Sequence, residues 1–262
     1  MNTNLTGKYA IVCGSTQGIG KAIAIELASL GANVTLFARN KEAIQAVLDN
    51  LHKSGGQKHQ SLVADFSFPE RVKQAIDAHL EKTPEVHILV NNSGGPAPGL
   101  AIDTDQETFV SAFQQHLVNN QTLVQAVVPL MKKEGYGRII NIISTSVRTP
   151  IAGLGVSNTI RGAVASWAKT LSAELGPYGI TVNNILPGLT MTGRLESLIK
   201  TRAAERGLSW DQMAAIMKET IPARRFGEPS ETAALAAFLA SPSAAFINGE
   251  SIRVDGGATP SI

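Results

Sequence analysis

The alternation of short apolar runs with helix-like stretches constrains the fold of this chain more than any other feature. The runs are rich in β-branched residues and almost uniformly apolar, which is typical of parallel strands buried on both faces. Seven segments have this pattern: 8–13, 33–38, 60–65, 86–91, 138–143, 180–186 and 251–255. Such alternation predicts an α/β fold, a Rossmann-type doubly wound parallel sheet of about seven strands with helices on both faces.

The organisation of the chain favours one domain over residues 1–262, because neither an internal repeat nor a linker-like segment divides it. One charged helical segment, at about 190–226, follows a strand and interrupts the alternation. Ligands of doubly wound sheets bind beyond the carboxyl ends of the strands. We therefore interpret 190–226 either as a surface insertion or as a helical lid over a substrate.

Composition excludes several classes of protein. Twenty-three Lys and Arg against 21 Asp and Glu leave a net charge of +2, which argues against a nucleic-acid or polybasic membrane partner. The single cysteine, Cys13, excludes an internal disulfide and a cysteine-based zinc site, and the histidines show no metal-ligand spacing. The first residues lack the apolar stretch of a signal peptide, and no apolar run reaches the roughly 18 residues of a membrane span. These features predict a soluble, cytoplasmic protein without a metal.

A glycine-rich turn joins the first expected strand to a helix. Glycines permit a tight turn and close approach of a ligand to the backbone. The helix N-terminus adds free N–H groups and a positive dipole end, which suit a pyrophosphate. Because a strand precedes the turn and a helix follows it, we interpret it as a dinucleotide site. Its candidate cofactor-binding residues are Gly14, Ser15, Gln17, Gly18, Ile19 and Gly20.

Six ordered motifs make the chain resemble a short-chain dehydrogenase/reductase over nearly its whole length. They are Gly14-x-x-x-Gly18-Ile19-Gly20, Asp65, Leu89-Val90-Asn91-Asn92-Ser93-Gly94, Asn141-Ile142-Ile143-Ser144, Pro187-Gly188 with Thr192, and Val254-Asp255-Gly256-Gly257. Within this family the chain is most similar to 3-oxoacyl-[acyl-carrier-protein] reductases and related ketoreductases. The resemblance implies a homo-oligomer, a tetramer or dimer, with the long helices 105–133 and 154–176 at the interface.

The end of the second expected strand bears on the choice of cofactor. An acidic residue there would bind the ribose 2′-hydroxyl of NAD and repel the 2′-phosphate of NADP. This chain has Ala38 at that position, followed by Arg39, and an arginine can hold a phosphate bidentately. We therefore expect NADP rather than NAD, the alternative being that Arg39 is only a solvated charge. The resemblance further implies that Asp65 contacts the adenine, Thr192 holds the nicotinamide amide, and the cofactor cleft includes Asn91, Gly94, Pro187 and Gly188.

The resemblance fails at the catalytic positions, where the family carries Asn, Ser, Tyr and Lys. Ser144 matches the serine that polarises a substrate carbonyl. The tyrosine is expected thirteen residues later, where this chain has Ser157, and the lysine four further on, where it has Arg161. His116 occupies the position of the asparagine. Three of the four expected groups are thus replaced.

These replacements change the proton chemistry. The hydroxyl of Ser157 donates hydrogen bonds but is a poor proton source, and Arg161, with an expected pKa above about 12, stays charged. Arg161 can still bind a ribose or stabilise an oxyanion. His116 has an ordinary pKa near 6.5 and is a candidate proton relay, the alternative being a packed core histidine. Arg148 is either a contact for an anionic substrate or a solvated loop residue.

Two functions remain open on the sequence. The first is an NADP-dependent oxidoreductase that reduces a ketone or 3-oxoacyl-type carbonyl of a small molecule or acyl thioester, with Ser144, Ser157, Arg161 and His116 as its catalytic set. The second is a non-catalytic NADP-binding sensor or scaffold subunit, which an intact glycine turn beside a rewritten catalytic set also fits.

Overall fold

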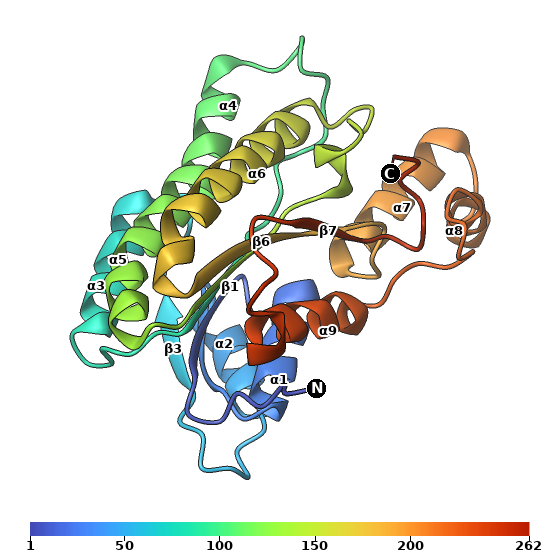
Figure 1. Cartoon of the computed structure of the whole chain (residues 1–262). Coiled ribbons are helices and arrows are strands. Elements are labelled where there is room, and N and C mark those ends of the chain that lie inside the picture. The colour runs from blue at the N-terminus through green and yellow to red at the C-terminus, as the bar shows by residue number, and fades with distance from the viewer. Residues whose placement is uncertain (262) are drawn as a thin grey trace.

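A computed structural model describes residues 1–261, in which the seven expected strands form one parallel sheet. The strand order is β3-β2-β1-β4-β5-β6-β7, and every neighbouring pair is parallel (Figure 1). The strands are β1 (Tyr9–Cys13), β2 (Asn33–Ala38), β3 (Gln60–Val63), β4 (Ile88–Asn91), β5 (Gly137–Ile142), β6 (Ile180–Pro187) and β7 (Ser251–Val254). The expected doubly wound α/β fold is confirmed.

Helices cover both faces of the sheet, and each layer encloses its own apolar core. One face carries α1 (Gly18–Ser29), α2 (Lys41–Leu48) and α9 (Pro229–Ala240). The opposite face carries α3 (Pro69–Leu80), α5 (Asn119–Glu134) and α6 (Gly155–Leu175). Short 3-10 turns follow β5, α6 and α9: Thr145–Val147, Gly176–Tyr178 and Pro242–Ala244.

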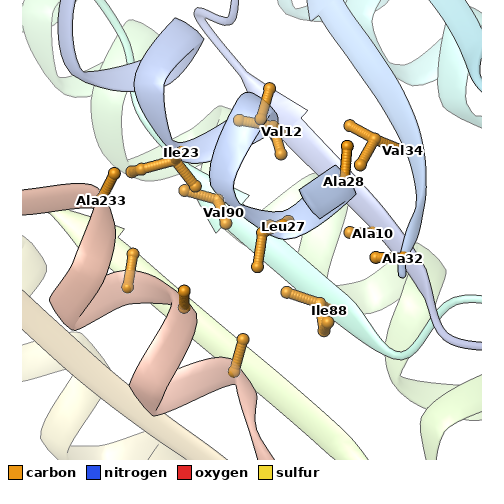
Figure 2. Packing of buried hydrophobic residues seen from close by; sticks show 14 of the residues in the cluster. Ala10, Val12, Ile23, Leu27, Ala28, Ala32, Val34, Ile88, Val90 and Ala233 are labelled. Atoms are coloured by element: carbon orange, nitrogen blue, oxygen red, sulfur yellow. The ribbon is translucent and has the colours of Figure 1, made fainter. Parts of the chain in front are cut away.

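The first of these cores fixes the helix that starts at the glycine turn. Ile23 and Leu27 of α1 are fully buried against the sheet, whose strands supply Val12 and Val90 (Figure 2). Helix α9 brings Ala233 and further alanines to the same core, and such small side chains let two helices pack closely. Each buried Ile or Leu stabilises this arrangement by about 1.5–3 kcal/mol. The N-terminus of α1 is therefore held rigidly at one edge of the sheet.

The segment 105–133, expected as one long helix, is interrupted. Helix α4 (Gln106–Phe113) leads into a π-helical turn, η1 (Gln114–Val118), before α5 begins. A π-helical turn inserts one extra residue into the i→i−4 ladder and often lies at functional sites. Here it carries His116, which is 1% exposed.

A ladder of side-chain amides crosses the sheet beside its carboxyl edge. Asn91, Asn141, Asn184 and Ser251 stand opposite one another on β4 to β7. Asn91 donates to Asn141 (2.9 Å), Asn141 to Asn184 (3.0 Å), and Asn184 to the Ser251 hydroxyl (3.1 Å). The ladder ends at the Asn91 Oδ1 atom, which is buried without a hydrogen-bond partner among the described residues. Satisfied buried amides specify one strand register, because a slipped register would leave them unpaired.

The segment 190–226 forms two helices, α7 (Gly193–Arg206) and α8 (Trp210–Glu219), which lie beyond the end of the sheet (Figure 1). They enclose a small apolar core of their own, to which Ile199 and Met213 belong. The segment leaves and returns at one point: the Met191 N–H donates to the Gly227 carbonyl at 2.8 Å, and the two chain ends form a parallel bridge between Thr190 and Gly227.

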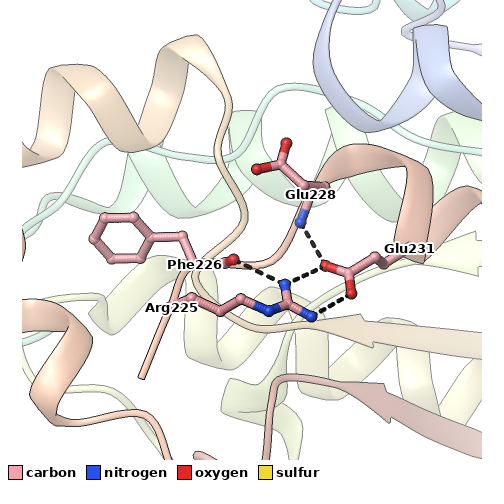
Figure 3. Close-up of polar contacts among 4 residues, drawn as sticks. All are labelled: Arg225, Phe226, Glu228 and Glu231. Carbon is pink, nitrogen blue, oxygen red and sulfur yellow. Dashed lines mark hydrogen bonds and ion pairs between the residues drawn. The ribbon is translucent and has the colours of Figure 1, made fainter. Parts of the chain in front are cut away.

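An ion pair fastens the returning end of this segment to α9 (Figure 3). The Arg225 guanidinium donates to both carboxylate oxygens of Glu231, at 2.7 and 2.6 Å. Glu231 also accepts the Glu228 backbone N–H at 2.7 Å, which caps the first turn of α9. The bidentate geometry orients this end of the segment. Because the pair is exposed to solvent, which screens its charges, we expect it to orient the segment more than to stabilise the fold.

Candidate active site

The strand order places a ligand site at the carboxyl edge of the sheet. Between β1 and β4 the chain changes the direction in which it adds strands, and such a crossover opens a crevice outside the strand ends. The glycine turn follows β1 there, and the loop that begins with Asn92 follows β4. Most of the residues expected to bind cofactor or substrate lie along this edge.

The geometry of the glycine turn requires glycine at two positions. Gly14 has φ +59°, and a Cβ there would lie 2.7 Å from Asn92 atoms. A Cβ on Gly20 would collide with the Gly14 carbonyl and lie 2.6 Å from the Asn92 amide nitrogen. That amide donates to the carbonyls of Cys13 (3.2 Å) and Gly14 (3.3 Å), so Asn92 holds the turn from the adjacent strand.

The turn fits a dinucleotide pyrophosphate. The residue before α1, exposed Gln17, places no side chain on the first N–H groups of the helix, and these remain available to an anion. Ser15 is fully buried, and its hydroxyl has no hydrogen-bond partner among the described residues. Gly18, with φ +52°, and half-buried Ile19 complete the turn. NADP bound here would supply a hydride donor or acceptor at its nicotinamide ring.

A basic groove lies at the ends of β2 and β3. Arg39 is exposed, and its Nη1 lies 3.9 Å from the Asp65 Oδ2. The groove has a volume of about 530 Å³ and adds Lys41 and Arg71, which the sequence analysis did not identify, to Arg39. Hydrogen bonds from the Ser67 backbone, together with the charges of Arg39 and Arg71, hold the pKa of Asp65 below its ordinary value. Three cations at the adenosine end fit a 2′-phosphate.

The end of β6 and the start of the 190–226 segment lie beside the glycine turn. Gly188 approaches β7 so closely that a Cβ would lie 2.8 Å from Asp255, and its N–H donates to the Val254 carbonyl. Thr192 caps α7, and its Cγ2 lies 3.1 Å from the position of a Cβ on Gly18. Pro187 and Gly94 occupy the neighbouring strand end and the loop after β4. Asn91 lies deeper, with its amide committed to the asparagine ladder.

The serine candidates stand on two elements that meet at the end of β5. Ser144 directly precedes the 3-10 turn after β5, and its Oγ accepts the Ser146 N–H at 3.1 Å, which leaves its own O–H free to donate. Ser157 lies in the first turn of α6 and is buried. Arg161 follows one turn later on the same helix and donates to the Ile142 carbonyl at 2.9 Å. This bond joins α6 to the last residue of β5, two residues before Ser144.

Burial lowers the pKa of Arg161 relative to the value expected from the sequence, but it does not remove the charge. Desolvation and, to a lesser degree, the charge of Arg194 lower the pKa of Arg161 to about 10. The pKa of this buried side chain therefore lies below the ordinary value of an arginine. The guanidinium nevertheless remains charged at neutral pH and places a positive charge near Ser157.

His116 reaches the site from the π-helical turn. Its Nδ1 lies 2.8 Å from the Ser93 Oγ, whereas its Nε2 is buried without a partner among the described residues. Desolvation, followed by the charges of Arg161 and Arg194, lowers the pKa of His116 to about 3. The imidazole is therefore neutral at neutral pH. Its ordinary pKa suggested a group that exchanges protons near pH 6.5, but in this environment His116 does not carry an extra proton at that pH.

Two contributors to the site were missed in the sequence analysis. Ser93 belongs to one of the motifs of the family resemblance but has no role assigned there, yet its hydroxyl pairs with His116. Arg194 extends from α7 to the loop after β4 and donates to the Pro96 carbonyl at 3.1 Å. Its position two residues after Thr192, at the start of a helix beyond a strand end, is the one signal that could have drawn attention to it.

Within residues 1–261 no helix is both long and apolar enough to cross a membrane. The same residues contain no group of three or more His, Cys, Asp or Glu side chains arranged to hold a metal ion.

The doubly wound sheet with a glycine turn after its first strand defines a Rossmann-type protein. Residues 14–259 match the family model described as enoyl-(acyl carrier protein) reductase. The NADPH-dependent reductase BacG of Bacillus subtilis is 30% identical over 98% of this chain and 100% of its own length. The 3-oxoacyl-[acyl-carrier-protein] reductase FabG of Vibrio cholerae is 34% identical over 97% and 98%. The chain therefore belongs to the short-chain dehydrogenase/reductase family of oxidoreductases.

A solved structure agrees with this assignment. L-sorbose reductase from Gluconobacter frateurii, complexed with NADPH and L-sorbose, superposes with a TM-score of 0.94 at 28% identity, and the match covers 100% of both chains. The likeness extends over the 190–226 segment as well as the sheet.

Proposed function

We propose that this protein is an NADPH-dependent carbonyl reductase acting on a ketone or 3-oxoacyl-type substrate. The observation that carries the proposal is the placement of Ser144 at the end of β5, joined to Arg161 of α6 through the Ile142 carbonyl. Relatives named as NADPH-dependent and 3-oxoacyl reductases support the reaction class. The intact glycine turn supports cofactor binding.

Ser144 and Ser157 are the hydroxyl donors in the proposed mechanism. The O–H of Ser144 donates to the substrate carbonyl oxygen, which polarises the carbonyl toward hydride addition. Arg161 stabilises the negative charge that develops on this oxygen, since a fixed charge in a buried site acts strongly on a developing oxyanion.

Proton delivery distinguishes this site from the Tyr-Lys arrangement of the family. Ser157 donates a hydrogen bond to the alkoxide, which takes its proton from solvent, and the neutral His116 positions the Ser93 hydroxyl. General acid catalysis is worth about 10²–10⁴ in rate, so replacing a tunable tyrosine by serine predicts slow turnover.

NADPH consumption tests the assignment. Wild type is compared with Ser144→Ala and with Ser157→Tyr/Arg161→Lys on a panel of ketones and acetoacetyl thioesters. We expect slow activity in wild type, a loss of at least tenfold in Ser144→Ala, and a gain in the double variant. Activity unaffected by Ser144→Ala would refute the assignment of the site.

The alternative function is a non-catalytic NADP-binding sensor or scaffold subunit. The neutral state of His116 favours it, because this candidate acid lacks an imidazolium proton near neutral pH. A wild-type protein that binds NADPH but is silent on the whole panel, while Ser157→Tyr/Arg161→Lys becomes active, would establish this alternative.

Preference for NADP over NAD is proposed to depend on the basic groove at Arg39. A charge-assisted hydrogen bond contributes about 1.5–3 kcal/mol, so Arg39→Gln is expected to weaken NADPH binding about tenfold or more while leaving NADH binding unchanged. Cofactor fluorescence titrations measure both affinities. Equal losses for the two cofactors would show that Arg39 does not select the 2′-phosphate.

A further inference from the structure

Arg161 and Arg194 direct two positive charges toward the carboxyl ends of β4 and β5. Arg161 comes from α6 and contacts the Ile142 carbonyl, two residues before Ser144. Arg194 comes from α7 and contacts the loop after β4, where a Cβ on Gly95 would collide with its Nη1 and the Pro96 carbonyl accepts from its Nη2. The charges reach the same space: Arg194 lowers the pKa of Arg161, after desolvation, and both lower that of His116.

Within residues 1–261, no carboxylate lies at ion-pair distance from either of these two charges. Among the described residues, the ion pairs are Arg39–Asp65, Lys73–Asp77 and Arg225–Glu231, and none involves Arg161 or Arg194. Within the part of the chain that the structure describes, each of the two guanidiniums donates to one backbone carbonyl, although it carries five N–H donors. Arg161 is moreover only 8% exposed. The buried charge of Arg161 is costly without a counter-charge, and an anion held between it and the more exposed Arg194 would offset that cost.

This space lies at the substrate end of the site. Thr192, at the start of α7, lies against Gly18 of the glycine turn, where the pyrophosphate is expected. Two residues further on, Arg194 reaches the Gly95–Pro96 loop, just beyond Ser93 and its partner His116. The two guanidiniums thus contact the end of β5, two residues before Ser144, and the loop after β4 that also carries Ser93, the partner of His116. The basic groove at Arg39, which fits the 2′-phosphate, lies on the other side of β1, at the ends of β2 and β3.

We propose that Arg161 and Arg194 together bind the carboxylate of an anionic carbonyl substrate, so that the protein favours oxoacids over neutral ketones. The inference rests on the proposed reductase function and names the substrate class of that site. Arginine suits this role because its planar fork matches a carboxylate. Arg148, the sequence-based candidate for an anionic substrate, is exposed after β5; Arg194 is exposed as well, but its bond to the Pro96 carbonyl fixes it against the loop after β4.

A binding experiment tests the anion site without requiring turnover. The probe is malonate, a dicarboxylate without a reducible ketone, titrated by calorimetry into the NADP⁺-saturated protein. The variants are Arg194→Gln and, as a matched control, Arg206→Gln, which removes an exposed arginine from the other end of α7. We expect malonate affinity to fall at least tenfold in Arg194→Gln and to change less than twofold in Arg206→Gln. Equal affinities in all three proteins would overturn the proposal.

A second titration separates a substrate carboxylate from a cofactor phosphate. NADP⁺ affinity is measured for wild type and Arg194→Gln by quenching of tryptophan fluorescence. An NADP⁺ affinity within threefold of wild type supports a substrate site. A loss as large as that for malonate would assign Arg194 to the cofactor phosphates and refute the proposal.

Kinetics with acetoacetate and its methyl ester then separate the inference from the function on which it rests. The expected result is a kcat/KM at least tenfold higher for the acid than for the ester in wild type, with this ratio falling toward one in Arg194→Gln. Equal rates for acid and ester in both proteins would refute the anion site and leave the reductase function standing. Silence toward both substrates, with selective loss of malonate binding in Arg194→Gln, would refute the function and leave the anion site standing.

Discussion

Replacing His116 by asparagine should make the protein less sensitive to mild acid. His116 is 1% exposed, and burial, reinforced by the charges of Arg161 and Arg194, lowers its pKa from 6.5 to about 3. The unfolded chain keeps the ordinary value. Between these two values the unfolded state binds a proton that the folded state does not, so stability falls as pH falls.

The size of the effect follows from this gap in pKa. At pH 7 the imidazole is largely neutral in both states, so the linkage costs little. At pH 5 the unfolded imidazole is almost fully protonated and the folded one is not. Between pH 7 and pH 5 this linkage therefore lowers the free energy of unfolding by about 2 kcal/mol. Asparagine does not titrate and should abolish this contribution.

Urea unfolding at pH 7 and pH 5, followed by tryptophan fluorescence at one protein concentration, measures the effect. Wild type should lose about 2 kcal/mol more than His116→Asn between the two pH values. The remaining histidines are present in both proteins, so their contributions cancel in the comparison. A pH-independent cost of the substitution lowers the stability of the variant equally at both pH values, and the double difference removes it. A double difference below about 0.5 kcal/mol, or an NMR titration of the His116 ring near 6.5, would refute the reasoning.

Two further predictions concern the elements that hold the site. Gly20→Ala should weaken NADPH binding at least tenfold in a fluorescence titration, because its Cβ would collide with the Gly14 carbonyl, whereas Gly162→Ala, where nothing lies within 4 Å, should bind normally. Asn141→Leu should lower the unfolding free energy by about 2–4 kcal/mol, because it leaves the Asn91 amide and the Asn184 oxygen unpaired in the sheet; a loss below about 1 kcal/mol in a urea titration would show that the ladder is not specific.

The sheet could be predicted from sequence because its strands are buried on both faces and therefore read as continuous apolar runs. The expected segment 180–186 matches β6 (Ile180–Pro187) within one residue. The expected segment 86–91 is longer than β4 (Ile88–Asn91), because Val86 is buried without joining the sheet. The π-helical turn at His116 was not predicted, because one inserted residue barely changes the periodicity of apolar positions along a helix.

The site was predictable where a motif is local and unpredictable where contacts are long-range. The glycine turn follows from neighbouring residues. The role of Asn92 depends on a strand 78 residues earlier, and that of Arg194 on a loop 98 residues earlier, separations that leave no periodic trace. The pKa of Arg161 follows from its enclosure by the fold, since the sequence shows only the type of residue.

The bridge between Thr190 and Gly227 also has an evolutionary consequence. Because the two ends of the 190–226 segment meet at one bridge and the segment packs around its own apolar core, another helical segment could replace it if the contacts with the loops after β4 and β7 were preserved. The entropy of closing such a loop grows only slowly with its length, by about 0.6 kcal/mol per doubling. Arg194 belongs to this segment, whereas Arg161 lies on α6 and Ser144 follows β5, both outside it. In a chain built in this way, a change in the 190–226 segment could alter the substrate while the glycine turn that is expected to bind the cofactor stays the same.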